Sequence, residues 1–139
     1  MNRIVFLDTS YAIALSAPAD QLHEQAVKIA GLIEVEGVSL VTTRAVTLEI
    51  GNALSKSRYR HAAIELLNSL EDDPAVEIVP FTEELYERAY QLYGSRADKE
   101  WGLTDCVSFI VMQERELGEA LTADEHFRQA GFVALLRES

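Results

Sequence analysis

The sequence predicts an α/β protein, a three-layer α/β/α sandwich in which helices cover both faces of a central parallel sheet. Short apolar runs alternate along the chain with longer stretches whose apolar residues recur at helical spacing. Parallel strands need long crossover connections, which helices supply, so this alternation favours a parallel sheet buried on both faces. With 139 residues, 48% of them hydrophobic, the chain suits a single domain over residues 1–139.

The N-terminal part of the chain predicts one strand and two helices. RIVFL (3–7) is a short apolar run of strand type, and SYAIALS (10–16) after it predicts one or two helical turns. In DQLHEQAVKIAGLIEVEG (20–37) apolar side chains recur at the spacing of a helix face, and Gly37 is a usual helix stop. The start loosely resembles a signal peptide, but Asp8 splits its apolar segment, so we expect it to belong to the mature protein.

The middle of the chain predicts two strands and two helices. VSLVT (38–42) is the second predicted strand, and Thr43 can cap a helix in RAVTLEIGNAL (44–54). YRHAAIELLNSLE (59–71) predicts a further helix, which ends at the breaker DDP. VEIVP (76–80) is the third strand-like run.

The C-terminal part predicts three helices and two strands. TEELYERAYQLYGSRA (82–97) and the apolar LTDCVSFIVM (103–112) are helical in pattern. EALT (119–122) predicts a short strand, ADEHFRQA (123–130) a turn of helix, and FVALL (132–136) a last strand.

Composition narrows the function classes. The net charge of -11 disfavours a protein that binds nucleic acid through an overall positive potential. It does not exclude a nuclease, because carboxylates that hold cations count as negative when the metal is left out. The single cysteine, Cys106, excludes an intrachain disulfide and fits a reducing cytoplasm. No apolar run approaches the ~18 residues of a membrane span, so we expect no membrane association.

Four carboxylates fall where parallel α/β sheets bind ligands, outside the carboxyl ends of strands. Asp8 follows the first predicted strand, Glu49 lies on the helix after the second, and Asp124 follows EALT. Asp105 lies in the first turn of helix 103–112, where the helix dipole favours a negative charge. Each acid taken singly could be a cap or turn residue, but the four together indicate a site.

Carboxylates gathered in one cleft repel each other. Two unit charges ~4 Å apart repel by ~4 kcal/mol at an effective dielectric near 20, so such a cluster takes up protons or binds cations. Oxygen ligands select hard ions such as Mg²⁺ or Mn²⁺. These ions, held by carboxylates, are a standard means of phosphodiester hydrolysis. The four acids therefore predict a metal-dependent phosphodiesterase.

Four motifs carry a family resemblance. LDTS (7–10), TLEIGNAL (47–54), WGLTDCVSF (101–109) and LTADEHF (121–127), in this order, resemble PIN-domain nucleases, especially the small toxins of bacterial and archaeal toxin-antitoxin pairs and their stand-alone relatives. The resemblance covers essentially the whole chain and keeps the approximate spacing of the acids. It implies a PIN-like fold, Mg²⁺- or Mn²⁺-dependent endoribonuclease activity, cytoplasmic location, frequent homodimers and, for a toxin, an antitoxin partner.

The resemblance also implies residue roles. Its catalytic, metal-binding acids correspond to Asp8, Glu49, Asp105 and Asp124. Thr9 or Ser10 would supply the hydroxyl that follows the first acid, and Thr122 the polar residue before the last. Asp98 is a fifth acid that could be an accessory ligand, or could pair with a neighbouring base on a loop, which we favour.

Basic residues flank the predicted site and could contact RNA phosphates despite the net charge, or could be ordinary surface. They are Arg44, Lys56, Arg58, Arg60, Arg96 and Lys99.

Several other side chains have two readings. His126 could be a general base, but we favour packing of a short helix with Phe127, because metal-activated water needs no histidine. Trp101 could stack on a base or anchor its loop. Cys106 and Met112 are expected to fill the core.

Helix 82–97 has two faces. Leu85, Ala89 and Leu92 form one face, and Tyr86, Tyr90 and Tyr93 form the other. The tyrosine spacing favours packing in the core or in an interface over a platform for base stacking. One face can cover the sheet and leave the other for a twofold partner, so we expect a homodimer.

Other classes fit less well. A phosphoacceptor signalling domain needs an acidic pair at its first strand and an aspartate after a central strand, but Phe81 and Thr82 follow VEIVP. A haloacid-dehalogenase phosphatase needs an aspartate two residues after Asp8, where Ser10 stands. A stand-alone PIN nuclease of RNA processing and a catalytically idle PIN-like binding module stay open.

Overall fold

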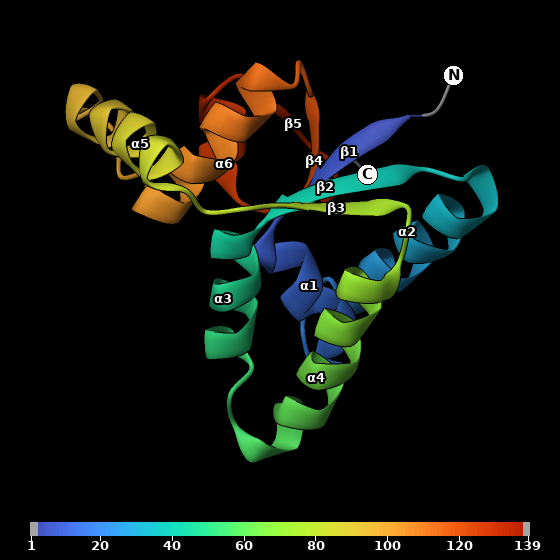
Figure 1. The fold of residues 1–139 in the computed structure, drawn as a ribbon. Coiled ribbons are helices and arrows are strands. Elements are labelled where there is room, and N and C mark those ends of the chain that lie inside the picture. Colours follow the sequence, from blue (N-terminus) through green and yellow to red (C-terminus); the bar gives the residue numbers. More distant parts are fainter. Residues whose placement is uncertain (1–2, 138–139) are drawn as a thin grey trace.

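A computed structural model describes residues 3–137, which contain a sheet of five parallel strands in the order β3-β2-β1-β4-β5 (Figure 1). The strands are β1 (Ile4–Leu7), β2 (Ser39–Thr43), β3 (Val76–Val79), β4 (Glu119–Leu121) and β5 (Val133–Ala134). The helices of this range are α1 (Thr9–Ser16), α2 (His23–Glu36), α3 (Arg44–Ala53), α4 (Ser57–Asp72), α5 (Glu83–Ser95), α6 (Leu103–Glu114) and α7 (Glu125–Gln129). The predicted parallel α/β sheet is confirmed.

The helices form two layers, one on each side of the sheet. Helices α1 to α4 lie below the sheet in Figure 1, whereas α5 and α6 lie on the other side. Strand β1 lies in the middle of the sheet, with β2 and then β3 on one side of it and β4 and then β5 on the other. Right-handed crossovers place the helices before β4 and β5 on the opposite face, and α7 accordingly packs against α6. The predicted three-layer arrangement follows from this strand order.

Local signals place several of the helix ends. The Thr43 hydroxyl accepts the Val46 N–H, so this residue caps α3 as predicted. Thr82 caps α5 in the same way. Gly37 ends α2 with φ 67°, a left-handed conformation that costs glycine little. Gly37 therefore ends the helix before β2, Thr43 begins the helix after β2, and Thr82 begins the helix after β3.

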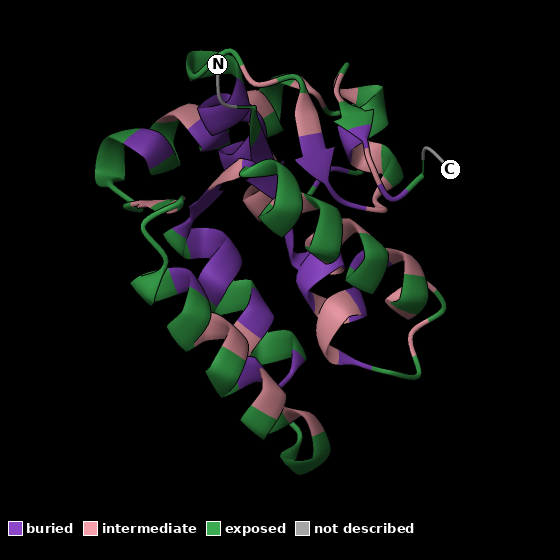
Figure 2. Cartoon of the chain, turned by 90° about the vertical axis from the view of Figure 1, so that its right-hand side faces the viewer, coloured by how far each residue is buried: buried purple, intermediate pink, exposed green. Residues whose placement is uncertain are grey.

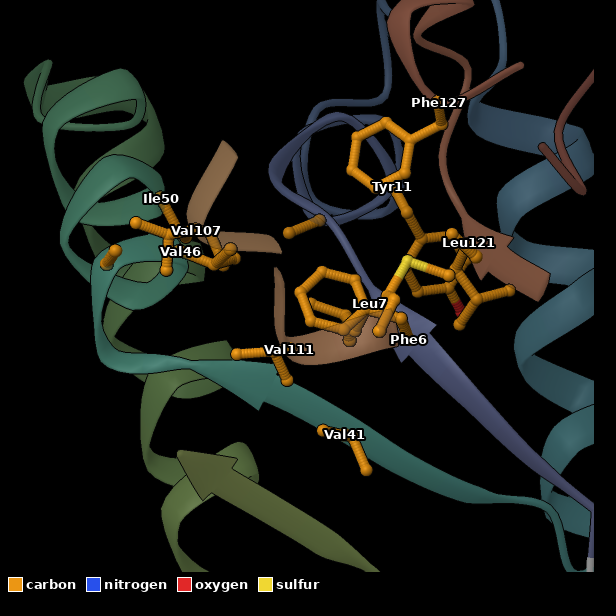
Figure 3. Packing of buried hydrophobic residues seen from close by; sticks show 14 of the residues in the cluster. Phe6, Leu7, Tyr11, Val41, Val46, Ile50, Val107, Val111, Leu121 and Phe127 are labelled. Carbon is orange, nitrogen blue, oxygen red and sulfur yellow. The ribbon is translucent and has the colours of Figure 1, made fainter. Parts of the chain in front are cut away.

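Helix α6 is the centre of the core. All residues from Cys106 to Met112 are buried, which confirms the core role expected of both end residues. Side chains from β1, α3 and α6 meet in one cluster, with Leu7, Val46 and Val107 among them (Figure 3). Buried segments face inward in both layers, while the outer faces of the helices are exposed (Figure 2).

Trp101 anchors its loop, which decides between its two readings. The indole is 5% exposed, packs edge-on against Phe109 with ring centroids 5.0 Å apart, and donates Nε1–H to Gln129. Because this ring is buried, it is not available for base stacking.

Two predicted boundaries were wrong. The last strand covers only Val133–Ala134 instead of FVALL, because its partner β4 is itself short and the chain then turns, with the Arg137 N–H bonded to the Ala134 carbonyl. Helix α2 begins at His23 rather than near residue 20, because the Asp20 carboxylate accepts the Leu22 N–H in a preceding turn.

Across residues 3–137, no helix is long and apolar enough to span a membrane.

Candidate metal centre

A cleft of about 540 Å³ opens at the carboxyl ends of the strands and is lined by all four predicted acids. Asp8 follows β1, and Asp124 follows β4. Glu49 reaches the cleft from α3 and Asp105 from α6. The strand order reverses between β1 and β4, and such a switch point is where open α/β sheets bind ligands. Residues that are far apart in the sequence therefore line one cleft.

Asp8 is tied to the end of β4. This carboxyl group is 5% exposed, and its Oδ2 accepts hydrogen bonds from the Thr122 hydroxyl at 2.7 Å and the Ser10 hydroxyl at 3.1 Å. The Ser10 oxygen also accepts the Ala123 N–H at 3.0 Å. Both predicted polar neighbours therefore contact the first acid and connect the ends of the two strands.

Glu49 is held by the other candidate hydroxyl. The Thr9 Oγ1 donates to Glu49 Oε1 at 2.5 Å, which links the start of α1 to the middle of α3. The sequence left open whether Thr9 or Ser10 serves the site. In the structure Thr9 contacts Glu49 and Ser10 contacts Asp8.

Asp124 caps α7, Asp105 accepts the N–H of the residue that caps α6, and both acids line the cleft. Asp105 Oδ2 accepts the Gly102 N–H at 3.1 Å, at the start of α6, and lies 2.9 Å from His126 Nδ1. Asp124 Oδ1 accepts the His126 N–H at 2.9 Å, at the start of α7. A cap uses only one oxygen of a carboxylate, so capping does not compete with a site role.

The four carboxylates share one pattern. Within residues 3–137, the hydrogen bonds that orient each group reach Asp8 Oδ2, Glu49 Oε1, Asp105 Oδ2 and Asp124 Oδ1, and the Thr9 main-chain N–H also stabilises the charge on Asp8. The second oxygens are Asp8 Oδ1, Glu49 Oε2, Asp105 Oδ1 and Asp124 Oδ2. Metal-binding carboxylates are typically oriented in this way, with one oxygen held by the protein and the other available to the ion.

The donor set fits a hard divalent cation. One carboxyl oxygen each of Asp105 and Asp124 and a ring nitrogen of His126 lie within 4.8 Å of one another. Burial raises the pKa of Asp8 to about 6 and also raises the pKa of Asp105. Burial opposes a charge on His126, but its hydrogen bond to Asp105 and the surrounding acids raise the pKa of this ring overall. Keeping Asp8 and Asp105 ionised in this cleft therefore costs free energy that a bound cation would offset.

Comparison with known proteins identifies the family. Residues 5–133 match the PIN domain. The chain belongs to the PIN domain family. The resemblance expected from the four motifs is thus confirmed, and these residues include all four acids of the cleft.

Individual relatives agree with this assignment. The 23S rRNA-specific endonuclease VapC20 of Mycobacterium tuberculosis is 27% identical over 135 residues, 97% of this chain and 100% of that protein. The crystal structure of that VapC20, described as a sarcin-ricin loop cleaving toxin, matches 93% of this chain and 96% of its own at 26% identity, with a TM-score of 0.82. This similarity confirms the predicted α/β/α fold.

Two more distant structures share the fold alone. VapBC2 from Rickettsia felis, bound to a DNA fragment from its promoter, has a TM-score of 0.68 at 13% identity, covering 94% of this chain and 96% of its own. FitAcB from Neisseria gonorrhoeae has a TM-score of 0.63 at 20% identity, covering 94% of each chain.

The remaining predicted residues lie outside the PIN cleft. Asp98 pairs with Arg96 at 3.0 Å, which agrees with the loop reading. Among the residues that line the cleft within the described range, none is lysine or arginine. Arg44 pairs with Glu71, while Arg60 donates to the Ser55 carbonyl. The other basic candidates are Lys56 and Arg58 beside the α3–α4 turn and Lys99 in a separate hollow near Trp101.

His126 is the cleft residue whose contact the sequence analysis missed. Packing was the favoured reading, and its neighbour Phe127 is indeed fully buried. The imidazole itself lines the cleft and contacts Asp105. A histidine two residues after an acid is a weak signal, because the contact depends on how α7 packs against α6.

The raised pKa of Asp8 predicts how stability depends on pH. An unfolded aspartate ionises near pH 3.9, whereas the folded group does so near pH 6. Between these values the unfolded state loses its proton first, so the metal-free folded state loses about 2 to 3 kcal/mol as pH rises from about 4 to above 6. Asp8→Asn should therefore gain stability relative to wild type over this range.

Urea unfolding with a chelator at pH 4.5, 6 and 7.5 measures this difference. The advantage of Asp8→Asn should grow between the first and last pH. An advantage that stays constant or shrinks would contradict the burial argument.

Proposed function

We propose that this PIN domain is an endoribonuclease that hydrolyses RNA phosphodiester bonds with Mg²⁺ or Mn²⁺ held by Asp8, Glu49, Asp105 and Asp124. The observation that carries the proposal is the convergence of these acids, from four separate segments, in one cleft, where hydrogen bonds from neighbouring residues orient each carboxylate. Similarity to VapC20, an rRNA endonuclease, supports RNA as the substrate.

The chain's own residues prepare the site. When bound, the ion polarises the phosphodiester and lowers the pKa of the attacking water. Thr9, Ser10 and Thr122 hold their acids through side-chain hydroxyls. The Gly102 N–H holds Asp105 at the start of α6. Since these donors are in place before substrate arrives, the carboxylates need little reorganisation.

Basic side chains around the cleft are proposed to bind RNA phosphates. Lys56, Arg58 and Arg60 follow Ala53, which lines the cleft at the end of α3. Arg44 and Arg96 are already paired with Glu71 and Asp98, so a phosphate there would replace an exposed ion pair. Lys99 lies in a hollow beside Tyr93. Phosphate contacts of this kind position a strand without reading its sequence.

The test combines metal titration with cleavage. Chelator-treated protein is titrated with Mg²⁺ or Mn²⁺ and incubated with an RNA oligonucleotide and with DNA of the same sequence. We expect metal-dependent cleavage of RNA within the strand. Metal binding without cleavage of any RNA, including ribosomal RNA, would favour the idle binding module.

We further propose that the protein is the toxin of a toxin-antitoxin pair and acts in the cytoplasm, where its RNA substrate is found. The similarity to a VapC toxin over nearly the whole chain supports this role. Its partner would be an antitoxin protein that inhibits the cleft. A stand-alone PIN nuclease of RNA processing is the alternative.

Helix α5 supports a homodimer. Its Leu85 and Ala89 are buried, and the helix packs mainly against α6 rather than directly on the sheet. On the opposite face Tyr86, Tyr90 and Tyr93 are 41%, 56% and 46% exposed, and the rings of successive tyrosines stack 6.1 and 6.5 Å apart. These rings lie outside the core, and their exposed, stacked surface supports an interface with a second copy of the chain.

Charge along this face suits an antiparallel pair of α5 helices. Glu83 lies beside Tyr86 at one end, and Lys99 lies beside Tyr93 at the other. A twofold axis near Tyr90 would place each acid against the partner's base.

Light scattering at high protein concentration should therefore give the mass of a dimer, and Tyr90→Glu should give a monomer. Val35→Glu adds the same charge at an 85% exposed site on α2 and should stay dimeric. A monomeric wild type would contradict the homodimer.

A further inference from the structure

His126 touches two of the four acids. Its main-chain N–H donates to Asp124 Oδ1 at 2.9 Å, and its ring Nδ1 lies 2.9 Å from Asp105 Oδ2 and 3.5 Å from Asp124 Oδ1. This residue therefore links the start of α6 to the segment that follows β4.

The imidazole is held by the packing of its neighbour. Phe127 is fully buried and meets Phe109 of α6 edge-on, with ring centroids 5.0 Å apart. This contact fixes α7 against α6 and so sets where the ring of His126 lies. The ring is itself only half-buried and faces the cleft.

The hydrogen bond between His126 Nδ1 and Asp105 determines which oxygen of this carboxylate stays available to an ion. An ionised carboxylate only accepts, so the hydrogen lies on Nδ1 of His126. Asp105 Oδ2 then has two donors, this ring nitrogen and the Gly102 N–H. Oδ1 is left for an ion, and Nδ1 is engaged by the carboxylate rather than available to a metal.

We propose that His126 is a positioning residue of the metal centre. Its side chain turns Asp105 so that Oδ1 serves as the ligand, and its main chain holds Asp124 at the matching distance. The inference rests on the metal site proposed above and adds a residue to it. Groups that orient metal ligands by hydrogen bonds typically contribute about 10- to 100-fold in metal affinity.

Two substitutions of similar size distinguish the effect of the lost hydrogen-bond donor from the effect of the lost imidazole ring. His126→Leu removes the donor, while His126→Asn keeps an N–H near the place of Nδ1. The main-chain bond to Asp124 remains in both. His61→Leu is the matched control, because this histidine is exposed on α4 and pairs with Glu65.

Isothermal titration of chelator-treated protein with Mn²⁺ gives the dissociation constants. We expect the Kd of His126→Leu to rise by about tenfold or more, and those of His126→Asn and His61→Leu to stay within about threefold of wild type. Circular dichroism verifies the fold of each variant, and His126→Ala replaces the leucine variant if the latter is unfolded. Electron spin echo spectroscopy of the Mn²⁺ complex should show no directly bound imidazole nitrogen.

The outcomes test the positioning role of His126 separately from the proposed metal site. A wild type that binds no Mn²⁺ or Mg²⁺ would overturn the proposed metal site itself. Normal Mn²⁺ affinity in the donor-free variant would overturn the positioning role alone, and so would equal weakening in the asparagine variant. A nitrogen coupling that His126→Leu abolishes would make His126 a ligand instead.

Discussion

Asparagine in place of Asp105 is expected to slow RNA cleavage by about a thousandfold or more, which corresponds to ~4 kcal/mol of barrier. Oδ2 of this residue is occupied by the Gly102 N–H and the His126 ring. The substitution therefore removes the charge that would bind the ion and puts an amide in place of a ligand carboxylate. Single-turnover cleavage measured over a range of Mn²⁺ concentrations separates weaker metal binding from slower chemistry.

The same change should leave the fold intact. Burial raises the pKa of Asp105, so a neutral amide is no worse than the carboxylate for the metal-free folded state. The midpoint of thermal unfolding in chelator should thus be equal to or above that of wild type. Amide substitutions at Asp8, Glu49 and Asp124 are expected to behave alike, because all four acids line one cleft.

Cys106→Ser is the matched control on the same helix. The thiol is fully buried in the core, next in sequence to Asp105, and it lines no part of the cleft. Serine there should lower the free energy of unfolding by about 1 to 3 kcal/mol through its buried hydroxyl and leave cleavage unchanged. Normal cleavage by Asp105→Asn would contradict the site assignment. A folded but inactive Cys106→Ser protein would contradict it as well.

The positions of the four acids could be predicted because they depend on chain topology. The residue that follows a strand lies at the carboxyl edge of the sheet, independently of its side-chain contacts. The hydrophobic pattern alone located β1, β2 and β4. Asp8 and Asp124 follow directly from that rule. Glu49 needed only the helical phase of α3, which places it at the edge of the apolar face, on the same side as Ala53 of the cleft.

Contacts between side chains could not be predicted in the same way. Thr9 and Ser10 are neighbours on α1, yet one bonds Glu49 and the other Asp8. This division depends on how α1 packs against α3 and on how Ser10 meets the segment after β4. His126 contacts Asp105 only because α7 docks on α6 through Phe127. Neither contact corresponds to a repeating pattern of residues from which it could have been predicted.

The second large effect is expected in cells. Production of the wild-type protein without an antitoxin should arrest growth of a bacterial host, because uncontrolled cleavage of RNA stops protein synthesis. Asp8→Asn should not arrest growth. Its amide still presents an oxygen to the hydroxyls of Thr122 and Ser10, so the fold is kept while the charge that would hold the metal is lost.

The cleft also indicates how an antitoxin would inhibit the enzyme. Its lining within residues 3–137 has acids but no lysine or arginine, so the acids lack a strongly basic partner in this part of the chain. An arginine or lysine inserted by a partner would pair with Asp8 or Asp105 and displace the metal. Co-production of the antitoxin should therefore restore growth.

Growth curves must be compared at equal protein abundance, verified by immunoblotting. Arrest by wild type and normal growth with Asp8→Asn would tie toxicity to the metal centre rather than to overproduction. If both proteins are equally harmless while purified wild type still cleaves RNA, the toxin role fails although the nuclease assignment stands. The acids would then serve a stand-alone PIN nuclease of RNA processing, whose substrates are too few or too well protected for cleavage to stop growth.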